Sequence, residues 1–437
     1  MANILLTTLC NLRCGYCFAR ERMVQKPSQT MSMENVEKVI DFLKRSDYPI
    51  FRMMGGEPTL HPHFPDIVKL ALNEGMRIDL LTNATWDAEY NQLFARISPN
   101  SLLFLLNIDH PENYPSRLWT AMENNLNTLA GRKGVSLSFN IFEKEPKYEY
   151  IFDLTTTYEI RRIRLSFSLP VIGEDNAHLD IHEYDEMATF IMDFVRRAED
   201  RGVGVQLDNA IPLCMFTYEQ VGELILKGVL DLTRNARCRP IIDIGPDLTV
   251  WCCFCLSTLC NRRLDEFETL GEIQDYYSRF FKPYQTQVFA LDKCYDCSYR
   301  TTWECQGGCT AFSVALDGNL CGNDSVDNNV HHDRCGSGSI LALADDVTID
   351  HYEIPKESYV LRNAAGHSVE VNASFKRLLD RLDGHRGSQQ VVNEFLNDEF
   401  GHGDHDPVAA FERRVMEEGF TDLLLALQKD GLIVLER

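Results

Sequence analysis

The sequence predicts an α/β fold: a partial (β/α)6 barrel of the TIM type, then a cysteine-rich α+β domain and a C-terminal winged-helix-like domain. Strand-like and helix-like segments alternate through the first 171 residues. The 15 cysteines form two groups, at 10–17 and at 214–335, and none follows residue 335. From these observations we predict domains at 1–215, 216–344 and 345–437.

The barrel prediction rests on six β–α units in series. Short apolar, β-prone runs predict strands at 3–8, 50–54, 77–83, 101–109, 135–142 and 162–171. Apolar residues at helical spacing predict helices at 32–47, 63–75, 85–97, 115–131 and 147–159, with Ser32 as the N-cap of the first. A linking helix at 180–201 and a strand at 203–209 follow. Such a series forms a parallel sheet with right-handed crossovers and places its site at the C-terminal strand ends.

Polar residues occur late in three of these strands, where that site would lie. Because strand residues alternate between faces, the residues of each set share a face. The sets are Asn107 with Asp109, Ser138 with Asn140, and Arg164 with Ser166 and Ser168. These residues either line a functional site or are polar only because they lie next to loops.

Size and charge limit the function. A chain of 437 residues with a formal net charge of −22 has no evident basic face for nucleic acid, so a basic peptide or a small metabolite fits better. No apolar run is long enough to span a bilayer, and "MANILLTTL" lacks a basic signal-peptide region. We therefore expect a cytoplasmic protein that binds neither nucleic acid nor membrane. In that compartment clustered cysteines indicate metal or redox chemistry.

Three cysteines follow the first predicted strand in the pattern C-x3-C-x2-C. Cys10, Cys14 and Cys17 can place three thiolates on one face of a [4Fe-4S] cluster and leave its fourth iron open, as a catalytic zinc site keeps one position free. A zinc knuckle or three unrelated thiols are the alternatives. With Tyr16 and Phe18 beside Cys17, the motif resembles that of the radical S-adenosylmethionine (radical SAM) superfamily.

That resemblance implies a cofactor pair and a reaction. The open iron would chelate the amino and carboxylate groups of S-adenosylmethionine, and the reduced cluster would cleave it to a 5′-deoxyadenosyl radical. A reductant such as flavodoxin or ferredoxin would supply the electron. The radical needs a dry cavity, since it otherwise reacts with solvent.

A second motif, "MGGEP", ends the second predicted strand. By resemblance Gly55, Gly56, Glu57 and Pro58 hold the methionine amino group, and "LTNA" with Asn83 matches the T-N-G turn of the family, Ala84 replacing glycine. The resemblance also assigns Asn107, Asn140 and Ser166 to the ribose or carboxylate of S-adenosylmethionine. Asp109 is our candidate catalytic residue, as a proton acceptor, and its alternative role is that of a structural or S-adenosylmethionine-orienting carboxylate.

The second cysteine group resembles the SPASM extension of radical SAM enzymes, with two zinc ribbons as the alternative. "PDLTVWCC" matches the hairpin of that extension, although Leu248 replaces a glycine, and the gap between C-x2-C and C-x3-C is seven residues rather than five. The resemblance implies one or two auxiliary [4Fe-4S] clusters. The first would use Cys238, Cys252 or Cys253, and Cys309, with Cys214 or Cys255 as fourth ligand. The second would use Cys294, Cys297, Cys305 and Cys321, with Cys335 in reserve. Cys260 has no evident role.

The cysteine-free tail predicts two β-prone runs around an Ala-Gly-His turn (358–372), three helices and a final strand. This outline resembles the winged-helix peptide-recognition module of peptide-modifying enzymes, and its acidic character disfavours DNA. The "HGDH" stretch (402–405) lies in a predicted loop and is not taken as a metal site.

These observations predict a radical SAM enzyme with a SPASM-type extension. Its substrate would be a ribosomally made peptide, modified by crosslinking, thioether formation, epimerisation or oxidation. Oxidation or rearrangement of a small molecule or cofactor precursor is the second hypothesis. An iron–sulfur electron carrier or regulator is the third, although such a protein needs no S-adenosylmethionine site.

Overall fold

The structure is a computed structural model. It describes residues 1–20, 28–239, 241–301 and 305–316, and in the C-terminal part 341–343, 348–352, 358–362, 368–372, 376, 378–382, 391, 394–395 and 433–435. The chain forms two compact units, Met1–Gly322 and Asn323–Arg437. The predicted boundary at 215/216 lies inside the first unit, so the barrel and the following cysteine-rich segment pack together.

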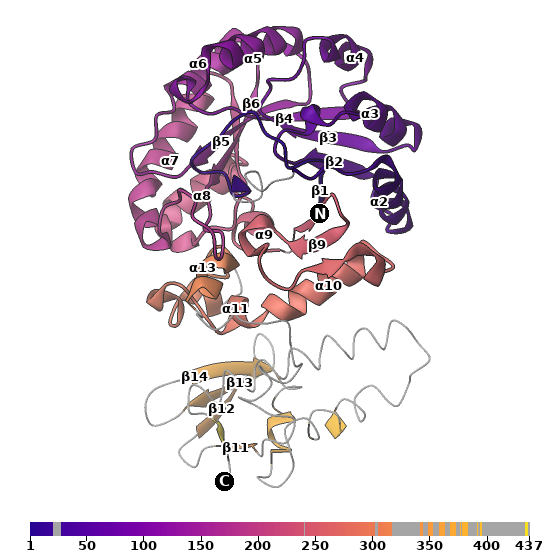
Figure 1. Cartoon of the computed structure of the whole chain (residues 1–437). Helices are drawn as coiled ribbons and strands as arrows, with labels where there is room; N and C mark the ends of the chain where they lie inside the picture. Colours follow the sequence, from indigo (N-terminus) through magenta and orange to yellow (C-terminus); the bar gives the residue numbers. More distant parts are fainter. Residues whose placement is uncertain are drawn as a thin grey trace. The chain divides into compact units, whose positions relative to one another are not determined.

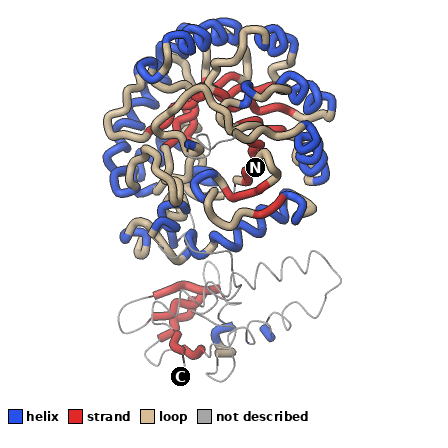
Figure 2. The backbone as a smooth tube through the Cα atoms, in the orientation of Figure 1, coloured by secondary structure: helices blue, strands red, loops and turns tan. Residues whose placement is uncertain are grey.

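One sheet of ten strands, curved and covered on its outer side by helices, organises the first unit (Figure 1, Figure 2). Its order is β10-β9-β8-β1-β2-β3-β4-β5-β6-β7, and every pair from β8 across β1 to β7 is parallel. The strands are β1 (Ala2–Leu5), β2 (Ile50–Met54), β3 (Arg77–Thr82), β4 (Leu102–Asn107), β5 (Val135–Ile141), β6 (Arg162–Phe167), β7 (Gly204–Leu207), β8 (Ile242–Ile244), β9 (Thr249–Cys252) and β10 (Arg262–Arg263).

The predicted α/β fold class is confirmed, and the sheet is wider than predicted. The six predicted strands are β1 to β6, and the strand predicted at 203–209 joins them as β7. At the other edge β8 adds to β1 in parallel, and β9 returns antiparallel. Leu248, in the turn between β8 and β9, has φ +66°, the conformation that favours the glycine expected there.

Helices connect the strands, as the 3.6-residue spacing predicted. They are α2 (Met33–Arg45), α3 (Phe64–Asn73), α4 (Tyr90–Arg96), α5 (Ser116–Leu129), α6 (Glu149–Thr157) and α7 (Tyr184–Glu199). The hydroxyl of Ser32 accepts from the N–H of Asn35 and caps α2 as predicted. The helix predicted at 85–97 is shorter, because Trp86 is buried and the amide of Asn125 donates to the carbonyl of Trp86 instead.

Short elements follow the barrel and carry the second cysteine group. They are η4 (Leu213–Met215), α8 (Tyr218–Leu226), α9 (Leu232–Asn235), η5 (Phe254–Leu256), α10 (Leu270–Phe281), α11 (Pro283–Thr286), η7 (Asp292–Cys294), α12 (Ser298–Thr301) and α13 (Thr310–Ala315). A core of buried apolar side chains runs from β1 to α13 without interruption. The cysteine-rich segment therefore has no separate core among the described residues.

In the second unit the predicted hairpin is present: β13 (Ser358–Arg362) pairs antiparallel with β14 (Ser368–Asn372). β12 (Thr348–Tyr352) extends this sheet, and β11 (Leu341–Leu343) pairs with the predicted final strand, β15 (Ile433–Leu435). The predicted helices and the "HGDH" stretch fall mostly or wholly outside the described residues.

Candidate functional site

The N-terminal thiol loop, residues 7–18, leaves the C-terminal end of β1. Its three cysteines are partly buried. Burial raises the pKa of Cys10 to about 11 and raises the pKa of Cys14 and of Cys17, and the negative charge of one thiolate adds to the shift of another. The N–H of Cys17 donates to the carbonyl of Cys14 (3.2 Å). The three thiols thus lie close enough to influence one another electrostatically.

The "GGE" loop after β2 packs directly against this thiol loop. The N–H of Gly56 donates to the carbonyl of Thr7 (2.8 Å), and the N–H of Glu57 donates to that of Leu9 (2.7 Å). A Cβ atom at Gly55 would lie 2.5 Å from the carbonyl oxygen of Thr7. Only glycine permits this approach, so Gly55 helps to position the loop that carries the cysteines.

The side chain of Glu57 holds β2 against β3. It is fully buried, and one carboxylate oxygen accepts from the hydroxyls of Thr59 (2.6 Å) and Thr82 (2.7 Å) while the other accepts from the N–H of Asn83 (2.8 Å). Burial raises its pKa, and these hydrogen bonds oppose the increase. Both carboxylate oxygens therefore accept hydrogen bonds from the protein itself. The predicted contact to the methionine amino group would then come from the backbone of the "GGE" loop.

Asn11 is a residue that the sequence reasoning missed. Its amide donates to the hydroxyl of Thr85 (2.8 Å), and its carbonyl accepts from the amide of Asn83 (2.9 Å). It ties the thiol loop to the end of β3, as the "GGE" loop ties it to β2. An asparagine directly after the first cysteine was the available signal.

A row of polar side chains crosses the ends of β4, β5 and β6. The amide of Asn140 donates to the carbonyl of Asn107 (2.6 Å), and the hydroxyl of Ser166 donates to the carbonyl of Asn140 (2.7 Å). The row reaches the thiol loop, where the amide of Asn107 donates to the hydroxyl of Tyr16 (3.5 Å). The structure thus brings together three residues predicted separately as contacts of S-adenosylmethionine.

Asp109 lies at the same edge, two residues beyond the end of β4. It is buried, and its carboxylate accepts from the N–H of His110 (2.7 Å). Its charge acts on Cys14 and on three buried tyrosines, Tyr16, Tyr114 and Tyr150. This carboxylate faces the thiol loop, which is compatible with either of the two roles predicted for it.

Five cysteines of the second group form one buried set, the first auxiliary set. Cys253 is hydrogen-bonded to Cys252 and Cys255, which lowers its pKa to about 5. The thiols of Cys238 and Cys255 are likewise hydrogen-bonded to Cys309 and lower its pKa. The same hydrogen bonds raise the pKa of Cys238, Cys252 and Cys255, so the five thiols form one connected hydrogen-bonded group.

Four further cysteines, Cys214, Cys294, Cys297 and Cys305, form a second auxiliary set. Burial raises the pKa of Cys294 to about 12, and the charges of Cys214, Cys305 and Cys297 add to this. Cys214 is thus within electrostatic reach of Cys294 and Cys305, whereas the sequence analysis offered Cys214 or Cys255 as the fourth ligand of the first cluster. Cys260 belongs to neither set, and Cys321 and Cys335 lie outside the described residues.

Within the described residues, no three His, Cys, Asp or Glu side chains are placed to hold a single metal ion. A four-iron cluster distributes its cysteines over separate irons. The donor sets, three thiols in one loop and two larger sets, fit iron–sulfur clusters in number and chemistry.

The comparisons with known proteins agree with this geometry. Residues 4–127 match the family model described as the radical SAM superfamily. The chain contains a radical SAM domain. The matched region includes all three cysteines of the thiol loop and the "GGE" loop, and the predicted membership is confirmed at this level.

Curated relatives are similar over parts of the chain. Fe-coproporphyrin III synthase of Methanosarcina barkeri is 32% identical over 80 residues, 18% of this chain and 20% of that protein. GTP 3',8-cyclase of Chlorobaculum tepidum is 40% identical over 70 residues, 16% of this chain and 20% of that protein. Neomycin C epimerase of Streptomyces fradiae is 24% identical over 183 residues, 41% of this chain and 50% of that protein. The chain therefore spans half or less of these relatives, which are named as enzymes.

Among solved structures, the fold resembles that of SuiB from Streptococcus suis bound to the precursor peptide SuiA. The TM-score is 0.51 at 15% identity, and the likeness covers 71% of each chain. The radical SAM domain and much of the region after it thus share a fold with SuiB. In the part of this chain that the structure describes, no helix has the length and apolar character needed to cross a bilayer.

Proposed function

We propose that this radical SAM enzyme modifies a ribosomally made peptide by abstracting hydrogen from it. The convergence of the thiol loop, the "GGE" loop and the polar row at one edge of one sheet carries the proposal. When bound to three thiolates, a [4Fe-4S] cluster supplies the electron that splits S-adenosylmethionine into methionine and a 5′-deoxyadenosyl radical.

The residues of the chain position this chemistry. Cys10, Cys14 and Cys17 would hold the cluster, and the backbone of the "GGE" loop would border the methionine. The row from Asn107 to Ser166 would offer amide and hydroxyl groups to the ribose or carboxylate of S-adenosylmethionine. These side chains hydrogen-bond to one another, so the row is preorganised for a ligand.

Asp109 is the candidate proton acceptor after hydrogen abstraction. Its carboxylate is buried and within electrostatic reach of Cys14, and tyrosine hydroxyls surround it. A buried setting excludes water, which would otherwise quench a carbon radical. A reductant of the flavodoxin or ferredoxin class would deliver the electron.

Two observations support a peptide as the substrate. The shared fold extends to SuiB in a structure that holds its precursor peptide. The net charge of −22 also favours a basic peptide over an anionic partner. The winged-helix domain predicted for residues 345–437 resembles a peptide-recognition module, so this prediction also favours a peptide substrate.

The names of the curated relatives support a small-molecule alternative. A GTP 3',8-cyclase and a neomycin C epimerase are both similar to part of this chain. These matches cover 16% and 41% of the chain, so most of it, including regions that could select the substrate, has no counterpart in them.

The test is anaerobic reconstitution of the full chain with iron and sulfide, followed by mass spectrometry of 5′-deoxyadenosine after addition of S-adenosylmethionine and dithionite. Candidate peptides, GTP and an aminoglycoside are added in separate reactions. We expect 5′-deoxyadenosine in all of them and a mass change only in a peptide. Iron-loaded protein that never forms 5′-deoxyadenosine would refute the function.

A further inference from the structure

The second auxiliary set lies where the end of the barrel meets the cysteine-rich segment. Cys214 belongs to η4, which follows β7, whereas Cys294 ends η7 and Cys297 precedes α12. The charge of Cys214 acts on Cys294, and the charge of Cys305 acts on Cys214. Four thiols from segments 80 residues apart in the sequence are therefore neighbours in space.

Two glycines make this approach possible. Gly307 and Gly308 have φ +81° and +97°. A Cβ atom at Gly307 would lie 3.2 Å from the sulfur of Cys294, and one at Gly308 would lie 3.2 Å from the Cδ atom of Pro212. The turn that carries Cys305 is thus pressed against the segment that carries Cys214.

Hydrogen-bond donors surround the sulfur of Cys305. The N–H of Gly307 donates to it (3.3 Å), and the N–H groups of Leu213 and Gly308 do so as well. One of these donors comes from the barrel side and precedes Cys214 directly. The sulfur of Cys305 also lies 4.0 Å from the carbonyl oxygen of Ile211, so it contacts the backbone of the segment that carries Cys214.

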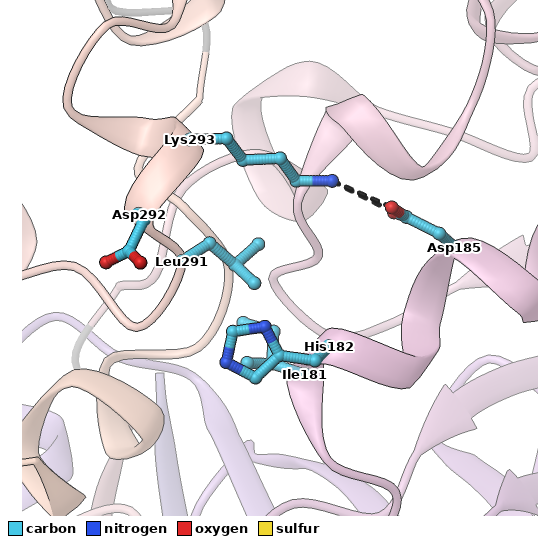
Figure 3. A pocket seen from close by; sticks show the side chains of 6 residues that line it. All are labelled: Ile181, His182, Asp185, Leu291, Asp292 and Lys293. Atoms are coloured by element: carbon cyan, nitrogen blue, oxygen red, sulfur yellow. Dashed lines mark hydrogen bonds and ion pairs between the residues drawn. The ribbon is translucent and has the colours of Figure 1, made fainter.

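A charged partner stands beside Cys214. Lys293 is hydrogen-bonded to the thiol of Cys214, and its ammonium group also donates to the carboxylate of Asp185 (2.8 Å). Figure 3 shows Lys293 and Asp185 at the edge of a cavity of about 310 Å³. The cavity is lined by Ile181, His182, Asp185, Leu291, Asp292 and Lys293. Lys293, next to Cys294, therefore contacts both Cys214 and the Asp185 carboxylate on α7 of the barrel.

We propose that Cys214 is the fourth ligand of an auxiliary iron–sulfur cluster held by Cys294, Cys297 and Cys305, so that this cluster joins the barrel to the cysteine-rich segment. Cys321 is then not a ligand. Each thiol releases its proton on binding. The assignment rests on the proposed function only in taking the metal to be an iron–sulfur cluster.

The first auxiliary set has no need of Cys214. Five thiols already meet there, and a four-iron cluster takes four. The groups that act electrostatically on Cys214 are Lys293, Cys305 and Asp185, and none of them belongs to the first auxiliary set.

The test compares the full chain with three variants, Cys214→Ala, Cys321→Ala and Cys260→Ala, after anaerobic reconstitution. Iron and sulfide are counted, and Mössbauer spectra identify the cluster types. We expect about twelve irons in the wild type, on three four-iron clusters. Cys214→Ala should lose about four of them or convert one cluster to a three-iron form. Cys321→Ala and Cys260→Ala should keep them all.

A Cys214→Ser variant keeps the assignment testable if Cys214→Ala misfolds, because a serine oxygen can still bind iron. We expect it to keep the iron and to change the Mössbauer parameters of one cluster. Full retention of unaltered clusters in both Cys214 variants would overturn the assignment, as would the loss of the same cluster from Cys321→Ala. Formation of 5′-deoxyadenosine by the wild type is measured in parallel, so failure of the proposed function is seen separately from failure of this assignment.

Discussion

The thiol loop and the two auxiliary sets contain different numbers of cysteines. The loop supplies three thiols at a sheet edge lined by polar side chains, whereas the auxiliary sets supply five and four thiols, most of them buried. A four-iron cluster with three protein ligands keeps one iron for a substrate, and one with four protein ligands does not. If each set holds such a cluster, the number of thiols is what would leave an open iron in the thiol loop and none in the auxiliary sets.

Removal of one thiol from the loop gives the largest expected effect. Cys14→Ala should reduce formation of 5′-deoxyadenosine to the background rate and remove about four irons, while both auxiliary clusters remain. The measurement is an iron count with turnover of S-adenosylmethionine. Cys260→Ala is the matched control, because Cys260 lies in neither auxiliary set. Unchanged iron in Cys14→Ala would contradict the comparison.

Crowding the thiol loop should have the next largest effect. In Gly55→Ala the new methyl group would lie 2.5 Å from the carbonyl of Thr7, so the "GGE" loop and the thiol loop must separate. We expect a loss of stability of about 1–3 kcal/mol, measured by urea unfolding, together with loss of iron from the loop alone. Gly222→Ala, inside α8 with no neighbouring atom within 4 Å of the new carbon, should keep all the iron and lose no stability, because alanine favours a helix more than glycine does.

Neutralising the buried carboxylate at the base of the site should cost less. Glu57→Gln places an amide group against N–H and hydroxyl donors, so at least one donor loses its acceptor. The free energy of unfolding should fall by about 1–3 kcal/mol. Glu37→Gln, on the exposed face of α2, is the control. Equal stability of the two variants would show that Glu57 does not hold β2 to β3.

Much of the thiol loop region followed from the sequence, because its contacts are set by strand order. Asn140 and Ser166 were each predicted late in their strands, and the register of β5 and β6 in the structure makes them partners. The glycine of "GGE" likewise marked a close approach of backbone.

The auxiliary sets were harder to derive, because nothing in the spacing of Cys214 shows which distant thiols it meets. That depends on the path of the chain after β7 and on the turn at Gly307 and Gly308. The link made by Asn11 and the shortened helix α4 were missed for a similar reason. Both depend on side-chain hydrogen bonds between segments remote in sequence.

The smallest predicted effect concerns Tyr184, beside the first auxiliary set. Its hydroxyl is buried without a hydrogen-bond partner among the described residues, and it lies within electrostatic reach of Cys255 and Cys309. Its ring stacks on Phe167 at 4.1 Å. A cluster sulfur would supply the missing acceptor, and hydrogen bonds to such sulfurs stabilise the reduced cluster.

Tyr184→Phe keeps the ring and removes this one donor. The midpoint potential of one auxiliary cluster should fall by about 20–60 mV, the one-electron equivalent of a hydrogen bond worth about 0.5–1.5 kcal/mol. A redox titration followed by electron paramagnetic resonance measures it, with Tyr90→Phe, remote from all three sites, as the control. The potential of the cluster on the thiol loop should not move, because no contact joins it to Tyr184 in the described structure. A shift at that cluster instead would mean that the reactive and auxiliary sites are not electrostatically separate.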